Sequence, residues 1–217
     1  MIRVFKNAET PDPLLNGKTY KDPEVEEQIF QDQNHKCYIC ERNRDTDTEV
    51  EHLKSRDNFP ELENDWNNLF LGCGFCNKRK GSRYDDILDP SQNNIEEIIE
   101  QHLNNYKQRV EFKISSSLQT NDAIEITISL LNRIYNGKNG LRKKGREERF
   151  FNSVQQEINI FRNMINQWLF EKSEEVKLAI KEALQIDKNQ LGLKYWIIQS
   201  NPVLKAEFSN DIIWNKK

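Results

Sequence analysis

Four cysteines in two close pairs constrain this chain more than any other feature of its sequence. Cys37 and Cys40 form one Cys-x2-Cys pair, and Cys73 and Cys76 form the other. Two such pairs supply the four thiolates of a tetrahedral zinc site, each pair forming a tight knuckle around the metal. Unrelated cysteines or two disulfides are the alternative. Because the chain opens with MIRVFKNAET, which has no cationic start before an apolar run, we expect a reducing, cytoplasmic location and one structural zinc ion.

The composition limits how such a chain can bind membranes or nucleic acid. Its 217 residues correspond to one or two domains, and no run approaches the roughly 20 apolar residues that cross a bilayer. We therefore expect no membrane partner. The formal net charge of -3 argues against binding nucleic acid through bulk electrostatics, so any nucleic-acid contact must be local.

The segment between the cysteine pairs, with the residue after the second pair, carries the side chains best suited to acid–base chemistry. His52 follows Glu51, and its imidazole, with a reference pKa of about 6.5, accepts a proton near neutral pH without a large shift. A carbonyl near Asn67 or Asn68 is expected to fix the tautomer of the ring. Glu51 and Asn77 offer hard oxygen ligands, which suit Mg²⁺ or Mn²⁺ better than zinc. We predict a general base beside a divalent-ion site, held in place by the separate zinc ion.

Positive charge is clustered around this segment, where we expect it to contact nucleic acid. The predicted contacts are Lys54 and Arg56 between the pairs, and Lys78, Arg79, Lys80 and Arg83 after the second pair. A later basic cluster, interrupted by glycines, contains Arg142, Lys143 and Lys144. Acidic residues at 147 and 148 favour a helix start there, so the cluster before them is predicted to be a loop. For this loop, phosphate contact and an ordinary solvated surface are both open.

Three regions are expected along the chain. Residues 1–36 are predicted to form an extended arm over 1–21 and a short amphipathic helix that begins at Pro23. Residues 37–90 form the metal-stapled module, with strand-like apolar positions at 50–53 and 69–71. Residues 91–217 form a mainly helical domain.

Apolar spacing predicts the elements of the C-terminal region. We expect a helix over 95–106, which contains His102 without a functional role, a strand over 110–114 and a helix over 120–133. The strongest helical signal is an apolar stripe with spacings of 3, 4, 3, 4 and 3: Phe151, Val154, Ile158, Phe161, Ile165 and Trp168. It continues over 176–184 after a break near Ser173. We interpret the stripe as a core-facing seam, whereas the apolar tail, including Ile213 and Trp214, packs on this domain or on another chain.

These motifs resemble the HNH endonuclease family, which has a ββα-metal fold. The resemblance rests on CYIC at 37–40, VEHLK at 50–54, NNL at 67–69 and CGFCNK at 73–78. It implies that His52 is the general base, that Asn68 supports the loop and orients the histidine, and that Glu51 and Asn77 bind the catalytic ion. Asn77 replaces the final histidine of the family name, and Glu51 replaces the commoner aspartate, which would loosen the metal geometry. The expected fold is α+β and mostly α, a zinc-stapled ββα-metal module with a helical C-terminal domain.

Most of the chain is similar more narrowly to the PtuB family, the HNH subunits of Septu and retron-associated anti-phage defence. The segments concerned are CYICERN, VEHLKSRDNFPEL, NLFLGCGFCNKRKG and ISLLNRIYNGKNGLRKKGR. This resemblance implies an endonuclease that acts on DNA with a PtuA-like ABC-type ATPase as partner. The ATPase would dock on the helical half and hold cleavage back until infection. The alternative is a non-catalytic zinc-knuckle module that binds nucleic acid or protein.

Overall fold

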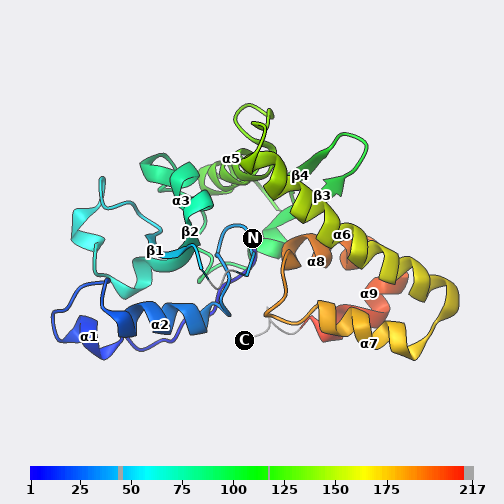
Figure 1. Cartoon of the computed structure of the whole chain (residues 1–217), viewed down its shortest axis with the longest axis horizontal. Helices are drawn as coiled ribbons and strands as arrows, with labels where there is room; N and C mark the ends of the chain where they lie inside the picture. Colours follow the sequence, from blue (N-terminus) through cyan, green and yellow to red (C-terminus); the bar gives the residue numbers. More distant parts are fainter. Residues whose placement is uncertain (44–45, 117, 213–217) are drawn as a thin grey trace.

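The computed structural model describes residues 1–43, 46–116 and 118–212. Figure 1 shows two parts: the left half carries two short N-terminal helices and a ββα unit, and the right half is mostly helical with a β-hairpin at its upper edge. The predicted α+β class is confirmed, and the described chain holds far more helix than strand. Ile213 and Trp214 of the predicted apolar tail lie outside the described residues. Within the described ranges, no helix is both long and apolar enough to cross a bilayer.

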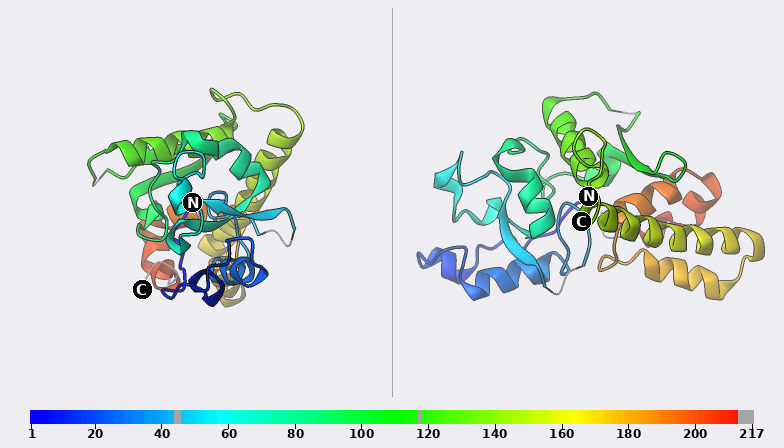
Figure 2. Two further views of the ribbon diagram at one scale, coloured as in Figure 1. Left: turned by 90° about the vertical axis from the view of Figure 1, so that its left-hand side faces the viewer. Right: turned by 45° about the horizontal axis from the view of Figure 1, so that its top comes forward.

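The N-terminal segment runs along the molecule before it forms helices. Its first residues are extended, and the Val4 amide donates to the carbonyl of Pro90, 2.8 Å away. The predicted extended arm is interrupted by the single turn of α1 (Asp12–Leu15), which Pro11 precedes. The predicted helix after it is confirmed as α2 (Pro23–Asp32), whose first turn is capped by the Asp22 carboxylate. Both views of Figure 2 show this blue segment below the cyan strands.

The zinc-ligand segment folds as two strands and a helix. Strand β1 (Thr48–His52) pairs antiparallel with β2 (Leu69–Cys73), and the register places His52 opposite Leu69. Helix α3 (Gly74–Lys80) follows β2 without a linker. Both strands were predicted from their apolar positions. The fold therefore places the end of β1, with His52, beside the start of β2.

The predicted helix over 95–106 is wrong beyond its first turn. The chain forms one turn of helix, α4 (Ile95–Ile98), and continues as β3 (Ile99–Asn104), so that His102 lies on a strand. Burial alternates along β3, which has a period of two residues rather than 3.6. Strand pairing explains why this segment is not helical: β3 pairs antiparallel with the correctly predicted strand, β4 (Arg109–Ile114).

Five helices complete the described chain: α5 (Asp122–Asn136), α6 (Arg146–Glu171), α7 (Glu174–Ala183), α8 (Leu191–Gln199) and α9 (Pro202–Phe208). The helices predicted over 120–133 and 151–168 are confirmed. Every residue of the predicted stripe is buried, so it is a core-facing seam. The predicted break is confirmed at Ser173, whose hydroxyl caps α7.

The hydrophobic core does not stop at residue 90. One cluster joins the four cysteines and Phe75 to β3, β4, α5 and the first half of α6, and a second fills the space between α6, α7, α8 and α9. Hydrogen bonds add to this packing: the Tyr135 hydroxyl donates to the Cys40 carbonyl at 3.3 Å, and the Gln190 amide donates to the same oxygen at 2.9 Å. The helical half therefore holds the cysteine knuckle in place.

Candidate functional site

The four cysteines meet in one buried cluster. Their Sγ atoms all lie within 4.8 Å of one another, and those of Cys40 and Cys73 are 3.8 Å apart. A tetrahedral zinc ion with Zn–S bonds of about 2.3 Å separates its sulfurs by about 3.8 Å. Burial raises the pKa of Cys37 and Cys76, a cost that a bound cation offsets because it takes thiolates as ligands. The predicted ligands Cys37, Cys40, Cys73 and Cys76 thus fit one zinc ion.

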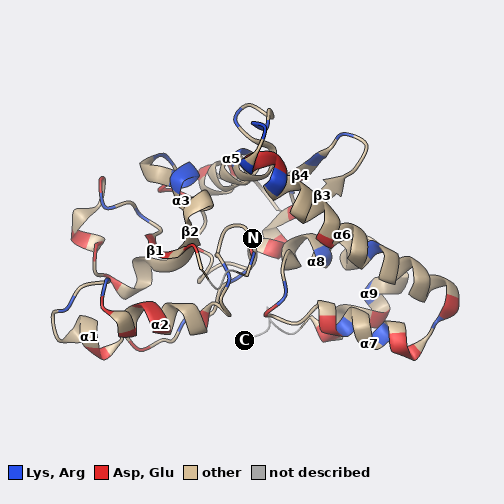
Figure 3. Ribbon diagram, viewed as in Figure 1, with Lys and Arg blue, Asp and Glu red and all other residues tan. Residues whose placement is uncertain are grey.

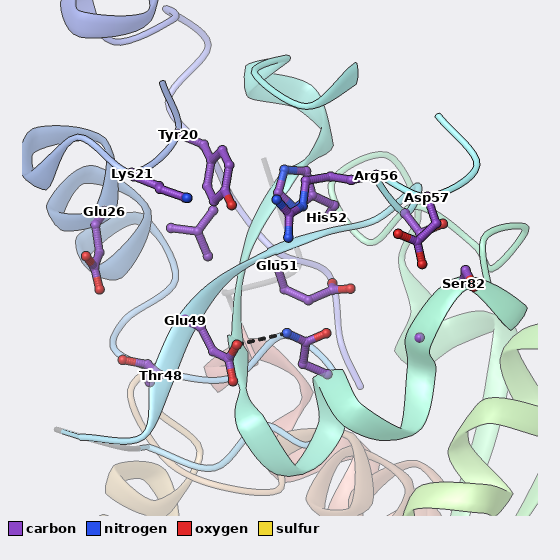
Figure 4. A pocket seen from close by; sticks show the side chains of 14 residues that line it. Tyr20, Lys21, Glu26, Thr48, Glu49, Glu51, His52, Arg56, Asp57 and Ser82 are labelled. Carbon is purple, nitrogen blue, oxygen red and sulfur yellow. Dashed lines mark hydrogen bonds between the residues drawn. The ribbon is translucent and has the colours of Figure 1, made fainter. Parts of the chain in front are cut away.

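A polar cavity of about 440 Å³ lies between β1, α3 and the loop that follows β1. Its lining includes Glu51, His52 and Asn77, which reach it from two different elements (Figure 4). Asn77 is the residue after Cys76 in α3, so the cysteine cluster fixes the turn of helix that presents it. The three side chains that were predicted to converge therefore line the same cavity.

His52 is held in one tautomer by a backbone carbonyl. Its Nε2 lies 2.8 Å from the carbonyl oxygen of Glu63, which can only accept, so Nε2 carries the proton. The predicted partner, a carbonyl near Asn67 or Asn68, is wrong because the Asn68 carbonyl accepts the amide of Leu53 instead. Nδ1 has no hydrogen-bond partner in the described part of the chain, which leaves it as the basic nitrogen.

The surroundings of His52 keep the ring neutral. Burial lowers the pKa of His52, and the nearby Arg56 cation acts in the same direction, while the Glu63 carbonyl opposes them. The ring of Tyr20 packs edge-on against the imidazole, with 4.7 Å between the ring centres. At neutral pH the imidazole is therefore ready to accept a proton.

Asn68 holds the loop that carries this carbonyl. Its Oδ1 accepts the backbone amide of Lys54 at 2.7 Å, and its Nδ2 donates to the carbonyls of Lys54 and Leu62 at 3.0 and 3.1 Å. Leu62 directly precedes Glu63. Asn68 is therefore connected to His52 through this loop, whose Glu63 carbonyl accepts from the ring.

Glu51 is tied to the protein through both of its oxygens. Lys80 Nζ lies 3.0 Å from Oε1, and the Tyr38 hydroxyl donates to Oε2. Burial raises the pKa of Glu51, and the Lys80 ammonium and the Tyr38 hydroxyl partly offset that rise. Lys80 also donates to the His52 carbonyl at 2.9 Å. Only 1% of Lys80 is exposed, so its predicted contact with nucleic acid is wrong, because the residue lies inside the protein.

Asn77 has a partner that sequence reasoning missed. Its Nδ2 donates to Glu49 Oε2 at 3.0 Å, the bond drawn as a dashed line in Figure 4. This contact fixes the amide so that Oδ1 is the end left for a cation. Glu49 also lines the cavity, two residues before Glu51 on the same face of β1. That two-residue spacing was the signal available in the sequence.

The predicted nucleic-acid contacts differ in how far their charges are already neutralised. Lys54 pairs with Asp86 at 2.7 Å, Arg56 with Glu63 at 3.2 Å, and Arg79 with Glu147 at 2.6 Å. No ion pair to Lys78 or Arg83 is found among the described residues. Figure 3 shows Lys and Arg on α3 and in the loop before α6.

That loop is where the later basic cluster lies, as predicted. The guanidinium of Arg142 stacks over the Phe151 ring, 3.7 Å from its centre, and the Lys143 amide donates to Glu147 at 2.7 Å. Lys144 is exposed. Because Glu147 also pairs with Arg79 of α3, the loop is tied to the ββα unit.

Comparisons with known proteins agree with this geometry. Residues 37–83 match the HNH endonuclease family. The Septu protein PtuB of Bacillus thuringiensis is 33% identical over 89 residues, which are 38% of this chain and 35% of that relative. The match thus spans about a third of the relative's length. No solved structure matches the chain significantly. Residues 37–83 therefore resemble HNH endonucleases, and an 89-residue stretch of the chain resembles PtuB.

Proposed function

We propose that this chain is a metal-dependent endonuclease that hydrolyses phosphodiester bonds in nucleic acid, with DNA as the favoured substrate. The observation that supports this most is the position of His52. Its Nε2 is occupied by the Glu63 carbonyl, and the ring lines the same cavity as two oxygen donors, Glu51 and Asn77. The match of residues 37–83 to HNH endonucleases supports the same chemistry.

The chemistry assigned to His52 is removal of a proton from water. Nδ1 accepts this proton as the water attacks phosphorus, while Nε2 stays bound to the Glu63 carbonyl and keeps the ring oriented. The pKa of His52 is lowered, so the acceptor nitrogen is free in the neutral range. His52 then passes the proton to solvent.

Glu51 and Asn77 would hold the second participant, a divalent cation. A bound Mg²⁺ or Mn²⁺ supplies Lewis-acid stabilisation of the phosphate and of the departing oxygen. A carboxylate has about four lone-pair sites, so the bonds from Lys80 and Tyr38 leave Glu51 able to accept another partner. The Glu49 carboxylate accepts a hydrogen bond from Asn77 Nδ2, which leaves Asn77 Oδ1 available to bind the cation.

The cellular role proposed here is that of the effector subunit of an anti-phage defence system. The relative's name, Septu protein PtuB, supports this assignment. A PtuA-like ABC-type ATPase would be the partner that controls cleavage. Co-purification of the two proteins tests the pairing, and a failure to associate in the presence and absence of ATP argues against it.

A cleavage assay separates the nuclease from a module that only binds. Supercoiled plasmid is incubated with the zinc-loaded protein and Mg²⁺ or Mn²⁺, with and without the ATPase. Metal-dependent nicking that is lost in His52→Ala supports the nuclease. Binding of nucleic acid that is equal in wild type and His52→Ala, with no turnover under any condition, supports the binding module.

A further inference from the structure

A second hollow, of about 450 Å³, lies beside the cavity that contains His52. We propose that it binds a backbone phosphate of the nucleic-acid strand next to the bond being cut. This inference rests on the proposed function and adds to it the path of the substrate. Its lining includes Asn58, Lys78, Arg79, Ser82, Arg83 and Arg133, of which Lys78, Arg83 and Arg133 carry the proposal.

The two hollows share one short segment of their lining. Gly81 and Ser82 line both of them. Gly81 follows α3 with φ at +49°, and no atom of a described residue outside its own stretch of chain lies within 4 Å of the point where a Cβ would stand. Gly81 itself places no side chain between the two linings, which favours the passage of an extended strand there. A strand cut beside His52 therefore has a route into the second hollow.

The charge of the second hollow suits an anion. No aspartate or glutamate lines it, whereas four carboxylates line the first: Glu26, Glu49, Glu51 and Asp57. Lys78 and Arg83 are exposed, and within the described ranges neither forms an ion pair. Lys54 and Arg56, near the first cavity, are each paired with a carboxylate. Unpaired cations gain most from a phosphate, because they lose no existing partner when it binds.

The helical half of the chain completes this hollow. Arg133 reaches it from α5, and its Nε donates to the Arg79 carbonyl at 3.1 Å. This bond fixes the guanidinium and leaves its terminal N–H groups for a ligand, since none of them has a hydrogen-bond partner among the described residues. A forked guanidinium in fixed orientation is suited to a phosphate, which accepts two parallel hydrogen bonds. The site therefore combines residues in and around α3 with a residue of α5 that is distant in the sequence.

The loop beside Ser82 is rigid enough to hold such a site. The Asn58 amide donates to the Ser82 carbonyl at 3.0 Å and to the Asp85 carboxylate at 2.7 Å. Asp85 also accepts from the amide and the hydroxyl of Ser55, each at 2.8 Å. The segment that joins the two hollows is thus fixed to the loop after β1, and little order has to be gained when a strand binds.

The test measures binding without cleavage. His52→Ala protein with its zinc retained is titrated with fluorescent single-stranded DNA, duplex DNA and RNA at several salt concentrations. Lys78→Ala, Arg83→Ala and Arg133→Ala are each expected to reduce the slope of log affinity against log salt by about 0.7–0.9, the value for one lost phosphate contact. Lys113→Ala, an exposed lysine on β4, is the matched control and should leave the slope unchanged.

These binding measurements test the phosphate site independently of whether the protein cleaves nucleic acid. An unchanged slope in all three variants overturns the phosphate site even if the wild-type protein cuts. A reduced slope supports it even if no cleavage is found. A loss confined to DNA or to RNA identifies which backbone the site accepts. Should Arg133→Ala fail to fold, as judged by zinc content and circular dichroism, Lys78→Ala and Arg83→Ala, both at exposed positions, decide the question.

Discussion

Lys80 forms a buried ion pair with Glu51, with 3.0 Å between Nζ and Oε1 and almost no exposure of either side chain. The pair connects the last residue of α3 to β1, and Lys80 extends the connection to the His52 carbonyl. A charge held this far from water is stable only while its partner is present. The geometry of the cavity therefore depends on a residue that does not line it.

Removing this cation should destabilise the protein. Lys80→Met leaves the Glu51 carboxylate buried without its counter-ion, and the expected loss is about 3–5 kcal/mol of unfolding free energy. Urea denaturation measures it. Lys78→Met, at an exposed position of the same helix, is the control and should change stability by less than about 0.5 kcal/mol. Equal stability of the two variants contradicts the role given to the pair.

The cysteine cluster should stabilise one part of the chain more than the other. Cys76→Ser removes one of the four ligands, and we expect loss of zinc with rapid hydrogen exchange over residues 37–83. The helices α6 to α9 have a second hydrophobic cluster of their own and should retain most of their protection. Elemental analysis and exchange mass spectrometry provide the two readouts. Folded wild-type protein that contains no zinc would refute the site.

The pH dependence of stability should carry the signature of Glu96. Burial raises the pKa of this carboxyl to about 7 from an ordinary value of 4.5, and its Oε1 has no hydrogen-bond partner within the described part of the chain. Between these values the folded protein binds more protons than the unfolded chain, so the contribution of Glu96 falls as pH rises from 4.5 to about 7. Over this pH range the contribution of Glu96 to the free energy of unfolding falls by roughly 3 kcal/mol in total.

Glu96→Gln removes this titration. Its stability relative to wild type should rise between pH 5 and pH 8, as followed by thermal unfolding at each pH. The exposed neighbour Glu97 provides the control, and Glu97→Gln should track the wild type. A difference between Glu96→Gln and wild type that is independent of pH would show that the carboxyl titrates normally.

Asn68 should matter for cleavage through the loop it holds. Asn68→Ala leaves three backbone groups of the loop without their partners, at an expected cost of about 1–3 kcal/mol. The Glu63 carbonyl then loses its fixed position, and cleavage should fall by at least about tenfold with zinc retained. Asn67→Ala, at the exposed neighbouring position, is the matched control. Similar cleavage by the two variants argues against positioning by Asn68.

The sequence predicted the parts of the site that depend on spacing. Two cysteine pairs in one chain specify a shared metal, and the residue after Cys76 must then lie close to it. Residues 99–104 were assigned wrongly to a helix because the isoleucines of this region and Leu103 fit helical and alternating patterns alike, and pairing with β4 decides between them. Contacts set by tertiary packing were also out of reach. The Glu63 carbonyl reaches His52 only because the intervening loop folds back, and the burial of Lys80 depends on packing around the end of α3.

The most direct test of the proposed chemistry is cleavage by His52→Ala protein. With Mg²⁺ or Mn²⁺ and any partner that wild-type cleavage requires, we predict that the rate falls by at least about 100-fold, the usual contribution of a general base, with zinc content and fold unchanged. His102→Ala, on β3, should cleave at the wild-type rate. Nicking by His52→Ala at the wild-type rate, in protein shown to be folded and zinc-loaded, would contradict the assignment of the general base.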